Sequence, residues 1–186
     1  MHIFVETERM WLRRFTLDDV DALLALDSDP RVRLYVEDGE PVTLERARIT
    51  IEHFLEYYEL MAACGFWAAV EKSSGTFLGW FHLRPHDRAN PHELELGYRL
   101  VADCWGKGYA TEGSRALIAM GFTTTDISRV VAETMVVHAA SRRVMEKSGL
   151  RLVRTFHTEW PVRIPGDELG DVEYAVTREE WEAQRA

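Results

Sequence analysis

Cysteine is scarce in this chain of 186 residues, which contains only Cys64 and Cys104. Two cysteines cannot form the disulfide framework that stabilises small secreted domains. We expect both to be small buried hydrophobic residues rather than redox groups. A reducing, cytoplasmic location is the corresponding expectation.

Basic residues and long apolar runs are also missing. The chain has 22 Lys and Arg against 31 Asp and Glu, a formal net charge of −9. Nucleic acids and anionic membranes both bind basic surfaces, so we expect neither as a partner. No segment approaches membrane-spanning length, and residues 1–15 lack the apolar stretch of a signal peptide. A cationic partner such as an amine is compatible with this charge balance.

Proline is infrequent, with six residues, while 46% of the chain is hydrophobic. This composition favours a globular domain without a disordered tail. The length suffices for one well-filled core and is too short for two ordinary domains. We therefore expect a single domain over residues 1–186, without internal repeats.

Hydrophobic periodicity predicts the secondary structure. Strands are expected at 10–15, 66–71, 76–83, 93–100, 129–137, 151–160 and 172–176. Helices are expected at 16–29, 43–64, 109–124 and 141–147, with a last helical turn starting at Thr177. A meander of strands, followed by strand, helix, strand, helix and strand, predicts an α/β fold. Its single mixed, mostly antiparallel sheet would carry helices on both faces.

Residues 103–113, DCWGKGYATEG, join a predicted strand to a predicted helix. Gly106, Gly108 and the small Ala110 would leave backbone N–H groups uncovered where the helix begins, as in an anion-binding site. A nucleoside-triphosphate P-loop has four residues between its glycines and a following Gly-Lys-Ser/Thr. The dinucleotide fingerprint needs Gly or Ala where Thr111 stands. Both nucleotide-binding interpretations therefore fit poorly.

The same loop resembles the acyl-CoA pyrophosphate loop of the GNAT acetyltransferase superfamily. In particular, Trp-Gly-Lys-Gly-Tyr-Ala-Thr-Glu is similar to the branch that acetylates ribosomal-protein N-termini (RimJ/RimL type). Trp105 departs from the polar residue that usually opens the family pattern. Segments 7–14 and 138–150 continue the resemblance, which thus covers nearly the whole chain. It implies a GNAT fold, acetyl-CoA as cosubstrate and direct transfer to a primary amine in a ternary complex; homodimers are frequent in the family.

The resemblance also implies how acetyl-CoA is bound. The backbone of residues 106–110 would hold the pyrophosphate, with the Thr111 hydroxyl as an added donor. The pantetheine arm would enter between the strand 93–100 and the next strand. There the N–H of Leu100 or Val101 would polarise the thioester carbonyl. The implied cofactor-binding residues are Leu100, Val101, Trp105, Gly106, Lys107, Gly108, Tyr109, Ala110, Thr111, His138 and Ser141.

The acceptor amine must be neutral when it attacks. A lysine-like amine, with a pKa of about 10.4, needs a base, whereas an α-amino group at about 7.7 to 8.0 is already partly neutral. Glu95, on the strand face that can line the cleft, is the first candidate for this catalytic base, and Glu93 shares that face. A salt-bridged strand carboxylate is the alternative for either residue. An N-terminal acceptor could react without a base.

The leaving thiolate, with a pKa of about 8.5, benefits from a proton donor. The tyrosine that usually supplies it in the family is replaced by Met145, which cannot donate. Ser141 at the helix start is the remaining candidate, with helix capping as its alternative role. His138 replaces the asparagine that normally contacts CoA. It could contact pantetheine, act as a catalytic acid or base, or be an ordinary strand-end histidine.

We expect no catalytic or binding role for two further groups of residues, a pair of histidines and a set of aromatic residues. His82 and His86 straddle a predicted strand end and Pro85, where helical spacing does not apply, so we expect no metal site. The aromatic residues are expected to belong to the core, because no basic stripe accompanies them. These are Trp67, Trp80, Phe81, Tyr98 and Trp105.

The acceptor is open at this point: a protein N-terminus and a small-molecule amine both fit. The departures at His138 and Met145 keep a second class of function in view, a non-catalytic acyl-CoA-binding regulatory module.

Overall fold

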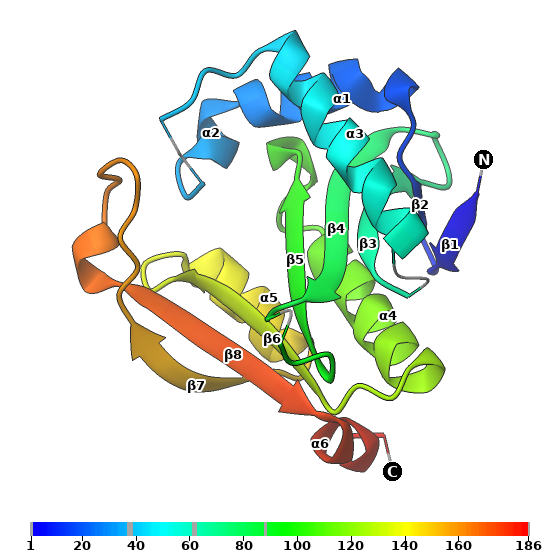
Figure 1. The fold of residues 1–186 in the computed structure, drawn as a ribbon, viewed down its shortest axis with the longest axis vertical. Coiled ribbons are helices and arrows are strands. Elements are labelled where there is room, and N and C mark those ends of the chain that lie inside the picture. Colours follow the sequence, from blue (N-terminus) through cyan, green and yellow to red (C-terminus); the bar gives the residue numbers. More distant parts are fainter. Residues whose placement is uncertain (1, 37–38, 61–62, 88, 186) are drawn as a thin grey trace.

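The structure, a computed structural model, describes residues 2–36, 39–60, 63–87 and 89–185. A single eight-stranded sheet forms its centre, with helices on both faces (Figure 1). The strands are β1 (Ile3–Glu6), β2 (Met10–Arg14), β3 (Gly65–Glu71), β4 (Phe77–Pro85), β5 (Glu93–Leu100), β6 (Arg129–Met135), β7 (Arg151–Phe156) and β8 (Asp171–Thr177). The helices are α1 (Val20–Ser28), α2 (Pro30–Arg33), α3 (Leu44–Leu60), α4 (Tyr109–Thr124), α5 (Ala139–Lys147) and α6 (Arg178–Ala183). Within these described residues, none of the helices has the length and apolarity needed to cross a membrane.

The strands follow the order β1-β2-β3-β4-β5-β6-β8-β7. Every neighbouring pair is antiparallel except β5 and β6. The predicted mixed, mostly antiparallel sheet is therefore confirmed. The bounds predicted for β5 and α4, the two elements that flank the glycine loop, agree with the structure residue for residue.

Two short elements at the beginning of the chain differ from the prediction. The strand predicted at 10–15 is not the first, because β1 precedes it and pairs with β2. Pro30 was expected to follow the end of a helix, but it begins α2. Asp29 caps that helix by accepting the Arg31 N–H at 2.9 Å. A proline at the first helical position loses no hydrogen bond, which is why it can start a helix as well as end one.

Helix starts were predicted at Thr16, Thr43 and Thr177, and the last two are confirmed. After Thr16 the chain first forms a 3-10 turn (Leu17–Asp19), in which Asp19 accepts the backbone N–H of Thr16 at 2.8 Å, and α1 begins only at Val20. Thr43 accepts the N–H of Arg46 at 3.1 Å at the start of α3. Thr177 and Glu180 form the expected capping box at α6.

The core lies in two layers, one on each face of the sheet. The layer toward α4 includes Phe81 and Leu83 of β4, packed with Leu117 and Phe122 of the helix. The opposite layer, under α1 and α3, contains Phe15, Leu23, Leu26, Ile51, Phe54 and Phe66. Cys64 is buried as predicted, and burial raises the pKa of its thiol to about 11. Cys104 is only half-buried.

The parallel pair β5–β6 is joined over a short length only. Its register consists of Glu93 with Arg129, Leu94 with Val130 and Glu95 with Val131. Beyond Glu95 the two strands diverge (Figure 1). In the described part of the chain, no strand therefore pairs with β5 on the β6 side from residue 96 to residue 100, and this opening leads to the glycine loop at residues 103–113.

Gly113 of α4 sets how closely this helix packs on the sheet. A Cβ at this position would lie 2.6 Å from Cε1 of Phe81, a fully buried ring. We expect Gly113→Ala to lower the free energy of unfolding by about 1–3 kcal/mol through overpacking. Gly121→Ala is the matched control, because its Cβ would meet only flexible side-chain ends at 3.0 and 3.1 Å. Urea unfolding of both variants measures the difference, and equal stability would contradict it.

Candidate functional site

The glycine loop presents an uncovered row of backbone donors. Gly106 and Gly108 have φ angles of 73° and 86°, in the left-handed region that favours glycine. Gly108 is the N-cap residue of α4 and makes no side-chain cap. Across the described chain, no hydrogen bond uses the backbone N–H groups of residues 106–111. A helix start with free N–H groups favours negative charge, so the loop can hold an anion.

Contacts that avoid these N–H groups hold the loop in place. Glu112 Oε1 accepts the Thr7 hydroxyl at 2.6 Å and the Arg9 N–H at 2.8 Å, and its Oε2 pairs with Arg9 Nε at 2.6 Å. Arg9 also donates to the carbonyl of Lys107 at 2.9 Å. The loop is therefore fastened to the β1–β2 turn through side chains and one carbonyl, and its donors stay open.

Glu112 should make the stability of this loop depend on pH. Burial raises its pKa, but hydrogen bonds from Thr7 and Arg9 outweigh burial, so the folded pKa lies below the ordinary value. Its contribution is then present above the unfolded pKa of about 4.3 and is lost as the pH falls through the folded pKa.

We expect Glu112→Gln to destabilise the protein by about 1–2 kcal/mol at pH 7, and by progressively less below about pH 4. Glu52→Gln is the control, because Glu52 forms an exposed pair with Arg48 on α3 and exposed pairs contribute little. Denaturant unfolding at a series of pH values tests this. A pH-independent difference between wild type and Glu112→Gln would show that the carboxylate charge has no such role.

The side chains of the loop residues have distinct surroundings. The Tyr109 hydroxyl donates a hydrogen bond to Glu71. Tyr109 therefore contributes its backbone N–H, and not its side chain, to the row of free donors. Trp105, expected in the core, is 45% exposed, and its Nε1 donates to the carbonyl of Leu100 at 2.8 Å. Lys107 is exposed, and Ala110 and Thr111 are half-buried. Trp105 thus ties the loop to the end of β5.

The N–H groups of Leu100 and Val101, the two donors predicted for the thioester carbonyl, differ in whether they are free. The N–H of Val101 is donated to the carbonyl of Leu78 on β4 at 2.9 Å, so Val101 is not a free donor. N–H groups of successive strand residues point to opposite edges. The N–H of Leu100 therefore points to the β6 side, where β6 has diverged. Val101 was therefore wrongly expected to be a free donor for the thioester carbonyl, and Leu100 is the candidate that remains for this role.

Ser141 lies opposite this edge, in the first turn of α5. The Tyr98 hydroxyl, from β5, donates to the Ser141 carbonyl at 3.0 Å and lies 3.0 Å from its Oγ. Burial raises the pKa of the Tyr98 phenol, which therefore stays protonated. Ser141 is buried, and Met145, where the family tyrosine usually stands, is also buried. A tyrosine hydroxyl thus reaches Ser141 from the strand instead of from the helix.

Tyr98 was expected to belong to the core, and its contact with Ser141 was not foreseen. Leu94, Leu96 and Leu100 occupy every second position of β5 together with Tyr98 and face the same core layer. A signal for it did exist, because a buried tyrosine hydroxyl usually finds a hydrogen-bond partner.

His138 is the N-cap residue of α5, and its ring stacks on Tyr35 with the centroids 3.8 Å apart. Burial lowers the pKa of His138 to about 4. The imidazole is therefore neutral at pH 7 and does not act as an imidazolium acid. Its Nδ1 is buried without a partner among the described groups. This nitrogen can still exchange a hydrogen bond with a bound molecule.

Both candidate bases are salt-bridged. Glu95 Oε2 pairs with Arg84 at 2.7 Å, and His82 Nε2 lies 3.7 Å from its Oε1. Burial raises the pKa of Glu95, but the hydrogen bond and charge of His82 and the charge of Arg84 bring it below the ordinary value. Glu93 pairs with Arg129. Glu95 is therefore ionised at neutral pH and is a weak base. No three His, Cys, Asp or Glu side chains of the described residues group into a metal site.

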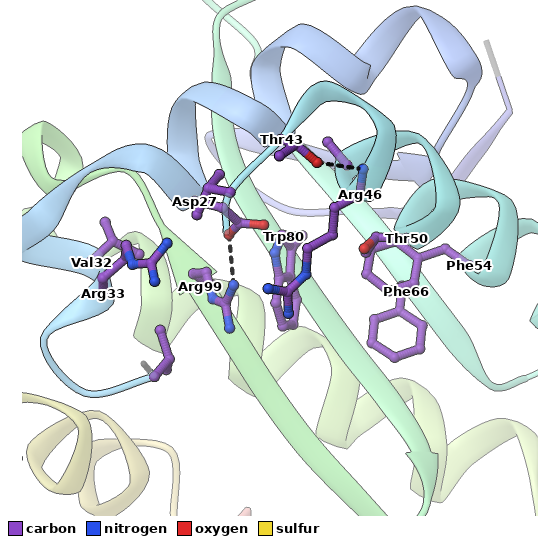
Figure 2. A pocket seen from close by; sticks show the side chains of 13 residues that line it. Asp27, Val32, Arg33, Thr43, Arg46, Thr50, Phe54, Phe66, Trp80 and Arg99 are labelled. Atoms are coloured by element: carbon purple, nitrogen blue, oxygen red, sulfur yellow. Dashed lines mark hydrogen bonds and ion pairs between the residues drawn. The ribbon is translucent and has the colours of Figure 1, made fainter. Parts of the chain in front are cut away.

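A cavity of about 260 Å³ opens on the same face of the sheet as Glu95 (Figure 2). Phe54, Phe66 and Trp80 provide its aromatic part. Trp80 and Phe66 also contact the ring of His82, the neighbour of Glu95, at centroid distances of 5.7 and 5.0 Å. The cavity thus lies between the sheet and the helical layer of α1 and α3, and Arg99 is the residue of β5 that lines it.

A row of N–H donors at a helix start, next to the free edge of a splayed strand, is a geometry that can hold an extended anionic molecule. Residues 9–151 match the family model described as the Acetyltransferase (GNAT) domain, and the chain belongs to this family.

Three similar proteins illustrate the relationship. The FsC-acetyl coenzyme A-N(2)-transacetylase of Aspergillus fumigatus is 35% identical over 164 residues, which cover 85% of this chain and 69% of that protein. The crystal structure of a GNAT-family acetyltransferase from Bacillus anthracis has a TM-score of 0.78 at 24% identity and covers 95% of this chain and 99% of that chain. The ribosomal L7/L12 alpha-N-protein acetyltransferase RimL, in complex with coenzyme A, has a TM-score of 0.79 at 20% identity, covering 95% and 98%.

These relationships confirm the family and fold expected from the sequence. They identify the protein as an acetyl-CoA-dependent N-acetyltransferase. The family match gives no support to the nucleotide-binding interpretation.

Proposed function

We propose that the protein moves an acetyl group from acetyl-CoA directly to a primary amine held in the cavity of Figure 2. The observation that carries this proposal is that three features occur along or next to β5: the free N–H groups of residues 106–111 after its end, its edge without a partner on the β6 side, and a cavity lined by its residue Arg99. The acceptor is an α-amino group, at a protein N-terminus or on a small molecule.

The cosubstrate supplies an activated acetyl thioester, and this chain supplies the groups that position it. The N–H groups of residues 106–111 bind the diphosphate, with the Thr111 hydroxyl beside them. A Cβ at Gly106 would meet nothing within 4 Å, so the loop is open on the Cβ side of Gly106. The Leu100 N–H stabilises the negative charge that develops on the thioester oxygen. His138 offers its ring nitrogen to the pantetheine arm.

Ser141 gives its proton to the departing sulfur, and Tyr98 prepares it for that step. The phenol has one proton, and Ser141 presents two acceptors for it, the carbonyl oxygen and Oγ. When Tyr98 donates to Oγ, the serine proton is free to point at the sulfur. Tyr98 is therefore a positioning residue that acts through Ser141. The proton that the amine gives up to Glu95 returns through water to the serine oxygen, so that the serine hydroxyl is restored.

The basicity of the site suits an amine of low pKa. Glu95 accepts the amine proton through water in this proposal, and its depressed pKa makes it a weak base. An α-amino group, with a pKa of about 7.7 to 8.0, loses its proton to such a base far more readily than a lysine at about 10.4. This difference favours α-amines over lysine side chains. Homodimer formation and a cytoplasmic location remain predictions.

The test is thiol release from acetyl-CoA in the presence of α-amines and lysine-type amines, with mass spectrometry of the products. We expect acetylated α-amine and stoichiometric CoA. Tight CoA binding with no release above hydrolysis for any amine would contradict the proposal and favour a binding module.

A further inference from the structure

We propose that Arg99 binds a carboxylate of the acceptor, so that the substrates of this enzyme are amines that also carry a carboxylate. The inference rests on the proposed function, in which the cavity of Figure 2 holds the acceptor. This inference narrows the acceptor class from all α-amines to α-amines that also carry a carboxylate.

Arg99 is held ready for a ligand but is not saturated by protein contacts. Its Nη1 donates to Asp27 Oδ1 at 2.6 Å, and its guanidinium carbon lies 5.2 Å from the centroid of the Trp80 ring. Its side chain is 27% exposed. Guanidinium has five N–H donors, and among the described residues no hydrogen bond uses Nε or Nη2 of Arg99. A fixed guanidinium with donors to spare fits a carboxylate in a bidentate fashion.

The charge of the cavity agrees with this assignment. Three arginines line it, Arg33, Arg46 and Arg99, and Asp27 is the one carboxylate among the described lining residues. Although the whole chain carries a net charge of −9, basic side chains outnumber acidic ones among the described residues that line the cavity. Polycationic acceptors such as polyamines and aminoglycosides are therefore disfavoured.

The place of Arg99 on β5 connects this site to the reaction. Arg99 directly precedes Leu100, whose N–H faces the opening between β5 and β6, and it shares the strand face of Glu95. A carboxylate on Arg99 thus holds a nearby amine close to the thioester position. The volume of about 260 Å³ suits a body of amino-acid size, with its apolar part on Trp80 and Phe54.

An amine with a carboxylate can be a free amino acid or a peptide with an acidic residue near its N-terminus. The experiment tests the two separately. One arm compares phenylalanine with phenethylamine, which lacks the carboxylate. The other arm compares short peptides with Asp or Asn at the second position. In each arm kcat/KM is corrected for the fraction of neutral amine. We expect the carboxylated partner to be preferred by at least about tenfold in one arm, as a charge-assisted hydrogen bond provides.

Arg99→Gln should bring that preference close to unity, whereas Arg48→Gln should retain it, because Arg48 lies outside the cavity in an exposed pair with Glu52. A preference that survives in Arg99→Gln, or a wild-type enzyme that favours the uncharged partner in both arms, would overturn the inference. If the wild type acetylates no amine, the proposed function fails separately. Calorimetry of the same compounds with the CoA-loaded wild type and Arg99→Gln then decides whether Arg99 binds the carboxylate.

Discussion

Gly108→Val is expected to weaken acetyl-CoA binding by about 100-fold, or ~2.7 kcal/mol. The φ angle of 86° at Gly108 is one that a β-branched residue adopts only with strain. A Cβ at this position would also lie 3.3 Å from Nη2 of Arg9, the side chain that fastens the loop through the Lys107 carbonyl at the start of α4. Both effects act at the point where the cosubstrate is bound. Isothermal calorimetry with CoA measures the change.

Gly75→Val separates loss of binding from loss of stability. Gly75 lies in the β3–β4 turn at a φ of 73°, and a Cβ there meets nothing within 4 Å. The control thus carries a similar backbone strain without touching the donor row. We expect it to lower the melting temperature while the CoA affinity stays within about twofold. Equal affinity in both variants would show that the donor row at Gly108 does not bind CoA.

Ser141→Ala is expected to lower kcat by about 100-fold, as removal of a general acid does, with little change in the KM for acetyl-CoA. Tyr98→Phe keeps the buried ring and removes only the hydroxyl. We expect about a tenfold lower kcat for it, since one hydrogen bond to Ser141 is lost. Because Tyr98 acts through Ser141, the double variant should be no slower than Ser141→Ala.

A control serine is present in the same helix region. Ser148, the C-cap residue of α5, is buried, and its hydroxyl has no partner among the described groups. Ser148→Ala should leave kcat unchanged within about twofold. Steady-state kinetics of the two single variants, the double variant and Ser148→Ala measures whether Tyr98 acts through Ser141. Multiplicative losses in the double variant would mean that Tyr98 has a structural role independent of Ser141.

The sequence was informative where strong local signals mark an element. The bounds of β5 and α4 were predicted correctly because alternation, glycines and a long apolar helical run define them. The donor row at residues 106–111 follows from the same glycines. The start of α2 was missed because Pro30 reads equally well as the end of one helix and the beginning of another.

The errors at the site have a different cause, because they depend on contacts between distant segments. The choice between Leu100 and Val101 is decided by which N–H faces β4, and a strand sequence does not give its register. Tyr98 and Ser141 are brought together only when β5 and α5 face each other across the opening. The ion pair of Glu95 with Arg84 likewise requires the β4–β5 register.

The central claim is that the backbone amides of residues 106–111 bind the diphosphate of acetyl-CoA. An NMR titration of the nitrogen-15-labelled protein with CoA observes these amides one by one. The account predicts that the largest shifts occur at residues 106–111, followed by Leu100, while Val101 and the Gly75 turn change little. Saturable CoA binding that leaves the amides of residues 106–111 unperturbed would contradict it.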